Sequence, residues 1–246
     1  MSQDNLFNSV LEINNATADD LFRIYTAASM SNSADKSSRF IFPKYRKDYS
    51  KTSSKTELRI SEQEARLLYC FNLNNNKYKY LYSIETPTDK LYNFARKKRT
   101  GNNDESNRGG RSALSDLSIY DSSLDNKLVN VEFKARNPTQ ESYDKDIEKL
   151  ILEGVCGNWF HLLKNTDNGT IKSLNFKFKS ALNKVILEKG FNENKDLWIL
   201  FFIVILEGNV IKHKELRFSQ LSDKGYIEKL FSENDDWETQ NITKFI

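Results

Sequence analysis

The sequence predicts an α/β protein with a mixed central sheet flanked by helices, and three observations lead to this fold class. A capped amphipathic helix is expected over residues 61–73. Three segments with strand-like alternation follow it. The uniformly apolar run at 197–206 is typical of a strand covered by helices on both faces. A meander of strands followed by a helical crossover implies a mixed sheet.

Length and composition describe a soluble globular protein. The chain has 246 residues, of which 38% are hydrophobic, and its mean hydropathy is −0.66. This length is enough to bury a proper core. We expect one compact domain with three parts: an N-terminal helix and basic irregular segment (1–56), a core (57–210) and a C-terminal extension (211–246).

Nothing in the sequence points to a membrane or to secretion. No basic stretch followed by an apolar segment marks a signal peptide. The apolar run at 197–206 is shorter than the roughly 20 residues that a membrane-spanning helix needs. Cys70 and Cys156 cannot form a disulfide framework. We therefore expect a cytoplasmic protein with no membrane partner.

Capping signals place two helices in the first third of the chain. Thr17 is expected to cap a helix over residues 17–29. Ser61 and Glu64 have the spacing of a capping box at the start of the second helix. Between these helices, residues 31–56 are expected to be irregular.

The expected strand at 78–86 ends at Pro87, because proline cannot donate to a sheet ladder. Residues 88–111 then form a long insertion, which in a compact domain is more often functional or disordered than structural.

Further helices are expected over residues 142–153 and 171–186, with a short helical piece at 159–163 between them. The chain after Val210 shows no clear period, so we expect a hairpin-like or irregular tail.

The segment at 129–135 places charge on one face of an otherwise apolar strand. Its alternation puts Glu132 and Lys134 on the same face, about 7 Å apart. Asp116 lies in the preceding strand, at 112–120. If the two strands pair across the intervening turn, Asp116 and Glu132 share one face at cation-bridging distance.

These acids resemble the active-site pattern of the PD-(D/E)XK nuclease superfamily, whose members have the restriction-endonuclease-like fold. The resemblance covers residues 61–206, and the αβββαβ core of that fold is similar to the element order expected here. It is carried by Glu64, Glu85, Asp116 and the Glu132-Phe-Lys134 triplet. The chain departs from the pattern at Ser115, where many relatives have proline.

The resemblance implies a Mg²⁺ site, at which Mn²⁺ can substitute, for phosphodiester hydrolysis. Lys134 would orient or deprotonate the attacking water and offset charge in the transition state. Glu64 would assist from the helix. Magnesium prefers oxygen ligands and usually takes only one or two carboxylates. The implied metal ligands are Asp116, Glu132, the main-chain carbonyl of Phe133, and Glu85.

Structural alternatives remain open for these residues. Glu132 and Lys134 could form a surface ion pair, worth about 0–1 kcal/mol. Asp116 could end a strand, and Glu85 could be solvated. The capping box by itself explains Glu64. For Asp146 and Lys149, we favour a pair on the helix surface or a buttress of the site.

Two basic segments are candidates for contact with a polyanion, although the net charge is only +3. A solvated loop is the alternative for each. The residues expected to contact nucleic acid are Lys44, Arg46, Lys47, Arg96, Lys97, Lys98, Arg99 and Arg111.

The function expected from this pattern is Mg²⁺-dependent cleavage of DNA, most simply by an endonuclease of the restriction, defence or mobile-element type. The expected substrate is double-stranded DNA, and the expected assembly a homodimer or a larger nuclease complex. The alternative is an inactive nucleic-acid-binding or assembly protein that keeps the fold. The two histidines lack the spacing of a zinc site, and no phosphate-binding glycine motif occurs.

Overall fold

A computed structural model describes residues 3–29, 40–46, 56–95, 110–192, 194–223, 225–232 and 236–242. The elements follow in this order: α1 (Gln3–Ser29), β1 (Lys44–Arg46), β2 (Thr56–Leu58), α2 (Glu62–Asn74), β3 (Leu81–Tyr92), η1 (Asn93–Ala95), β4 (Arg111–Tyr120), β5 (Lys127–Ala135), α3 (Gln140–Leu152), β6 (Cys156–Leu163), α4 (Asn168–Lys189), β7 (Trp198–Ile205), β8 (Val210–Arg217), η2 (Phe218–Gln220), α5 (Tyr226–Leu230) and β9 (Glu238–Asn241).

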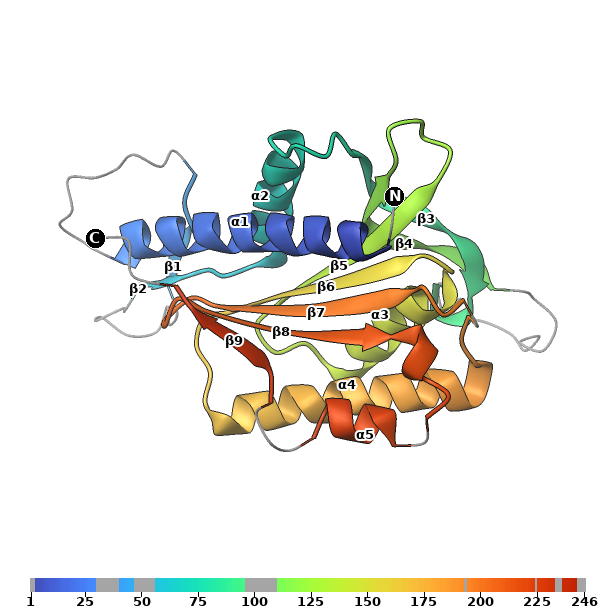
Figure 1. The fold of residues 1–246 in the computed structure, drawn as a ribbon. Helices are drawn as coiled ribbons and strands as arrows, with labels where there is room; N and C mark the ends of the chain where they lie inside the picture. The colour runs from blue at the N-terminus through green and yellow to red at the C-terminus, as the bar shows by residue number, and fades with distance from the viewer. Residues whose placement is uncertain are drawn as a thin grey trace, which may run out of the picture.

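The central sheet contains seven strands in the order β3-β4-β5-β6-β7-β8-β9 (Figure 1). Strands β3 to β5 form an antiparallel meander, β5, β6 and β7 run parallel, and β8 and β9 return antiparallel. The expected mixed α/β architecture, with helices flanking the sheet, is therefore confirmed. The crossover between β5 and β6 is made by α3, as a parallel pair requires.

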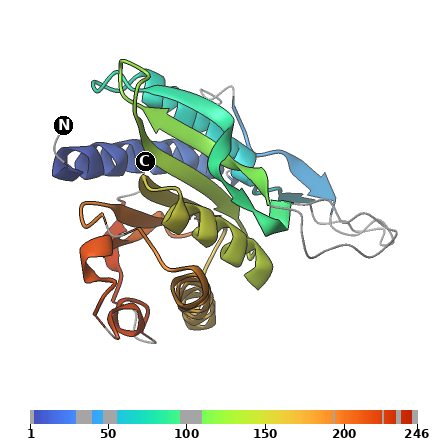
Figure 2. The ribbon, with the colours of Figure 1, turned by 90° about the vertical axis from the view of Figure 1, so that its right-hand side faces the viewer.

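Helices cover both faces of this sheet. Figure 1 shows α1 and α2 above the strands and α3, α4 and α5 below them, and Figure 2 shows the same layers from the side. On the first face, Tyr69 of α2 packs edge-on against Phe133 and Phe160. On the second face, Phe178 of α4 packs against Trp159. Both sides of the central strands are consequently buried.

Helix α1 begins at Gln3, well before the predicted start at Thr17. Leu6, Val10 and Ile13 form its buried stripe, with exposed fractions of 4% or less. Thr17 is not a cap but lies inside the helix, where its hydroxyl donates to the Ile13 carbonyl. The buried stripe at the N-terminal end therefore stabilises helix before Thr17, where the capping pattern had predicted the helix to begin.

Strand β3 runs through Pro87 to Tyr92, so the prediction that it ends at Pro87 was wrong. Pro87 is tolerated because β3 is an edge strand of the described sheet and bonds only to β4. Residues 88–92 thus belong to the strand and not to an insertion. Residues 96–109 lie outside the described part of the chain.

Residues 159–163 lie in strand β6, not in the predicted helical piece. Every residue of β6 is buried, because β6 lies between β5 and β7 and beneath helices on both faces. Such a strand shows no alternation, and a short apolar run cannot be told from a buried helix by period alone.

Two segments without a firmly predicted element also contain strands. The chain after Val210, expected to be hairpin-like or irregular, forms β8 and β9 of the central sheet. In the predicted irregular segment 31–56 lies β1, which pairs with β2 at the end of that segment. Across the described residues, no helix combines the length and apolar character needed to span a membrane.

Candidate functional site

Asp116 and Glu132 lie side by side on the face of the sheet that carries α3. The register that pairs Leu117 with Val131 places Asp116 of β4 beside Glu132 of β5. Two residues along, the Ser118 hydroxyl donates to Asn130 Oδ1 at 2.7 Å, which shows that the even-numbered residues share this face. The sequence-based expectation that the two acids face the same side therefore agrees with the register.

Glu132 is almost completely buried, with an exposed fraction of 1%. Lys149 Nζ of α3 lies 2.7 Å from Glu132 Oε1, but off the hydrogen-bond direction. Neither carboxylate oxygen of Glu132 has a hydrogen-bond partner among the described residues. A buried carboxylate in this state is costly unless a cation or a proton neutralises it.

Asp116 is more accessible than Glu132 and has a fixed orientation. Its Oδ2 accepts a hydrogen bond of 2.8 Å from the main-chain N–H of Phe133. This bond crosses from β4 to β5 directly beside Glu132. This bond therefore holds the Asp116 carboxylate close to the main chain of β5, next to Glu132.

Asp146 and Lys149 of α3 join Lys134 and Glu132 in a network of buried ion pairs. Lys134 Nζ lies 2.6 Å from Asp146 Oδ2, and Lys149 Nζ lies 2.9 Å from Asp146 Oδ1. Asp146 and Lys149 are 8% and 5% exposed, so they form no surface pair. We refer to Asp116, Glu132, Lys134, Asp146 and Lys149 as the acid–lysine cluster.

The charges of the cluster set the ionisation of its members. Burial raises the pKa of Glu132 well above its ordinary value. The nearby Asp146 and Asp116 carboxylates add to this rise, and the two lysines oppose it. Burial alone would lower the pKa of Lys134, but the surrounding carboxylates, Asp146 first, raise it above its usual value. Lys134 is therefore a cation at neutral pH.

Glu62 of α2 interacts electrostatically with this cluster. Burial raises the pKa of Glu62, with a further rise from Asp116 and an opposing effect from Lys134. Glu64 instead accepts a hydrogen bond from the Ser61 hydroxyl. The predicted capping box does not form, because the Ser61 side chain caps no main-chain N–H.

Arg136 ties the start of α2 to the end of β5. Its main chain has a φ of 62°, an unusual value for a residue with a side chain. This turn directs Arg136 Nε to the Ile60 carbonyl at 2.9 Å, two residues before Glu62. On the other side, His161 Nε2 lies 2.7 Å from the Arg136 carbonyl. Glu62 is thereby placed at the edge of the cluster.

The structure does not bring Glu85 into the cluster. Glu85 lies opposite Asp116 in the β3–β4 ladder, between the pairs that Ile84 and Thr86 make with Leu117 and Ser115. Its φ is 50°, and its side chain is 60% exposed. Arg66 of α2 pairs with it at 3.4 Å. Within the described residues, no three carboxylate, imidazole or thiol groups converge as a ready-made metal site.

Of the residues expected to contact nucleic acid, Lys44 and Arg111 can be placed. Both are exposed, Lys44 on β1 and Arg111 at the start of β4. The others lie outside the described residues: Lys47, Arg96, Lys97, Lys98, Arg99 and the side chain of Arg46.

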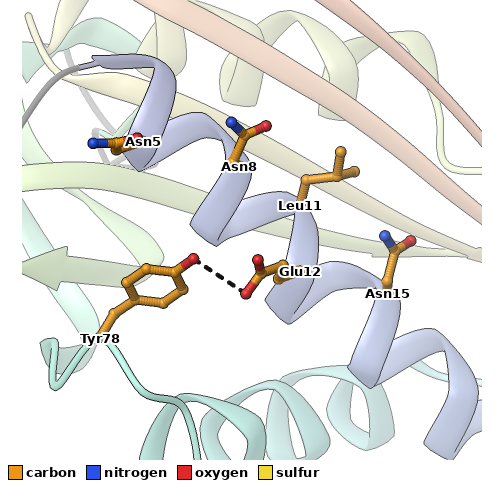
Figure 3. Close-up of a pocket in the computed structure, with 6 residues that line it drawn as sticks. All are labelled: Asn5, Asn8, Leu11, Glu12, Asn15 and Tyr78. Atoms are coloured by element: carbon orange, nitrogen blue, oxygen red, sulfur yellow. Dashed lines mark hydrogen bonds between the residues drawn. The ribbon is translucent and has the colours of Figure 1, made fainter.

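A separate hollow of about 580 Å³ lies along α1 (Figure 3). Its lining residues are Asn5, Asn8, Leu11, Glu12, Asn15 and Tyr78. The Tyr78 hydroxyl donates to Glu12 Oε2 at 3.2 Å, and Lys77 also pairs with Glu12. None of the residues of the acid–lysine cluster lines this hollow.

The acid–lysine cluster can hold a cation and position an anion. It offers two adjacent carboxylates, of which one is buried without hydrogen bonds, beside a lysine that stays protonated. No protein-family model, curated protein or solved structure matches this chain.

Proposed function

We propose that this chain is a metal-dependent nuclease of the PD-(D/E)XK type, which hydrolyses phosphodiester bonds in DNA. The order α2, β3, β4, β5, α3, β6 supports this proposal, since it follows the αβββαβ arrangement of that fold. Asp116 on β4 and the Glu132-Phe-Lys134 triplet on the neighbouring strand β5 also support it, because they resemble the acids and the lysine of the nuclease pattern.

The observation that carries the proposal is the burial of the Glu132 carboxylate beside Asp116, with only part of one lysine charge to neutralise it. A carboxylate that is 1% exposed and accepts no hydrogen bond needs positive charge nearby. The Lys149 ammonium group lies close to Glu132 but forms an ion pair with Asp146 as well, so it does not neutralise Glu132 fully. A divalent cation between Asp116 and Glu132 would supply that charge.

These residues fit Mg²⁺, which takes one or two protein carboxylates and keeps several waters. Asp116 and Glu132 would hold it, with the carbonyl of Phe133 as the proposed third ligand. When bound, the ion would supply positive charge and an acidified water at the phosphate. Metal binding requires deprotonated ligands, so it would also keep Glu132 ionised.

Lys134 acts electrostatically in this proposal. Its pKa is raised, so its ammonium group donates hydrogen bonds and does not take the proton of the attacking water. Asp146 holds Nζ by an ion pair of 2.6 Å. Lys134 therefore orients the phosphate or the water and offsets the negative charge that develops on the phosphoryl oxygens.

A second candidate is a nucleic-acid-binding or assembly protein that keeps this fold without turnover. The burial of Glu132 and its contact with Lys149 favour this candidate, because an internal ammonium already satisfies part of the metal site. The exposed cations Lys44 and Arg111 would then serve for binding alone.

A cleavage assay separates the two candidates. Supercoiled, nicked, linear and branched DNA would be incubated with Mg²⁺ or Mn²⁺ and with wild-type protein, Glu132→Gln or Lys134→Ala. Glu141→Gln is the matched control, because Glu141 is an exposed acid of α3. We expect cleavage by the wild type and the control only. Equal activity in all four proteins would reject the site, and no activity with retained DNA binding would favour the second candidate.

A further inference from the structure

Lys149 has the surroundings of a bound cation. Its Nζ lies 2.7 Å from Glu132 Oε1 and 2.9 Å from Asp146 Oδ1, and it donates to the Leu114 carbonyl at 2.8 Å. Its side chain is only 6% exposed. Three oxygen atoms from three elements of the fold thus surround one ammonium group.

The fold fixes this ammonium group firmly. Asp146 and Lys149 lie three residues apart on α3, so both side chains project from the same helix face. The Leu114 carbonyl belongs to β4, and Pro87, its partner in the β3–β4 ladder, has no N–H to donate. Lys149 is therefore held by the main chain of the sheet as well as by two carboxylates.

The formal charges around the site leave room for one divalent ion. With all acids ionised, as a bound cation would keep them, Glu62, Asp116, Glu132 and Asp146 carry four negative charges, and Lys134 and Lys149 carry two positive ones. The neighbouring Arg66 and Glu85 pair with each other and cancel. One divalent cation brings the set to neutrality, whereas a second would leave an excess positive charge in a largely buried region.

We propose that Lys149 is a built-in cation of this site, standing where a second metal ion would otherwise be needed, so that the site takes a single divalent ion. This inference rests on the proposed nuclease function and specifies its metal requirement. The single ion binds at Asp116 and Glu132. Lys149 neutralises the side of Glu132 that faces α3.

The test counts ions directly, without an activity measurement. Protein would be titrated with Mn²⁺, and free Mn²⁺ would be followed by electron paramagnetic resonance. We expect one Mn²⁺ per wild-type chain, and loss of that ion in Asp116→Asn. Lys149→Ala frees two carboxylate oxygens and vacates space, so we expect two Mn²⁺ per chain. Lys145→Ala removes a half-exposed lysine of the same helix and should keep one.

The outcomes distinguish the two proposals. Two ions in the wild type would overturn the role of Lys149 and leave the nuclease proposal standing. No ion in the wild type would overturn both. A folded Lys149→Ala protein that still binds one ion with unchanged affinity would also overturn the role of Lys149. If circular dichroism shows that Lys149→Ala does not fold, the wild-type count remains decisive.

Discussion

Lys134 Nζ of β5 and Asp146 Oδ2 of α3 lie 2.6 Å apart, and both side chains are nearly buried. This ion pair joins the sheet to the helix that crosses over to β6. The ion pair with Asp146 holds the Lys134 ammonium group in place. A residue of helix α3 thus positions a residue of strand β5.

Replacing Asp146 by Asn is expected to reduce both stability and cleavage. The change leaves two buried lysines with one fewer negative partner, a situation that costs about 3 kcal/mol. We also expect cleavage to fall roughly tenfold or more, as for residues that support a metal site. Urea denaturation and the cleavage assay measure the two effects. Glu141→Gln, on the exposed side of α3, should change neither, and equal effects of the two variants would contradict the assignment.

The two acids at the start of α2 should behave differently. Glu62 borders Asp116 and Lys134, whereas Glu64 accepts a hydrogen bond from Ser61. We expect Glu62→Gln to weaken Mn²⁺ binding roughly tenfold and Glu64→Gln to leave it nearly unchanged. Calorimetric titration of both variants measures this difference. A larger effect at Glu64 would restore the sequence-based assignment of that residue.

His161 should make the protein sensitive to acid. Burial lowers its pKa to about 4, whereas an unfolded chain titrates near 6.5. Between these values the unfolded state binds more protons. This contribution to stability is therefore complete above about pH 6.5 and is lost as the pH falls toward 4, by about 3 kcal/mol in total.

Urea denaturation of the wild type and His161→Gln between pH 4 and pH 8 tests this contribution. The glutamine variant should show a flatter dependence over the same range, since its side chain does not titrate. Parallel curves for the two proteins would show that His161 does not cause the sensitivity.

A pair of buried amides should couple α1 to the sheet. Asn14 Nδ2 donates to Asn158 Oδ1 at 3.0 Å, and Asn158 Nδ2 donates back to Asn14 Oδ1 at 2.9 Å. Both residues are completely buried. A double-mutant cycle with alanine at each position should give a coupling of about 1–2 kcal/mol. Additive losses would show that the two bonds do not stabilise the protein together, and alanine at the exposed Asn165 should cost under about 0.5 kcal/mol.

The strand pair that carries Asp116 and Glu132 could be predicted because its information is local. Residues 112–120 and 129–135 alternate with period two, and only a short turn separates them. Antiparallel pairing across such a turn fixes which side chains share a face. The helices α3 and α4 were likewise predictable from their apolar stripes.

The uniformly apolar run of β7 was predicted as a strand, but β6, which is also buried on both faces, and the full length of the edge strand β3 could not be assigned in this way. Strand β6 has no polar face, so its sequence does not distinguish it from a buried helix. Pro87 predicts the end of a strand, but it lies inside β3, an edge strand of the described sheet, where a missing N–H is tolerated. In both cases the deciding factor is the position of the strand in the sheet, which a local window does not contain.

The sequence by itself determined the mixed α/β class, the shared face of Asp116 and Glu132, and the triplet that ends in Lys134. Only the tertiary structure decided that Asp146 and Lys149 are buried against this triplet, that Glu62 borders it, and that Glu85 turns away to Arg66. The physical reason is that these contacts join β5 to helices distant in the chain, and packing across the sheet sets which face of each helix is buried. Helical period alone leaves Asp146 and Lys149 equally suited to the surface.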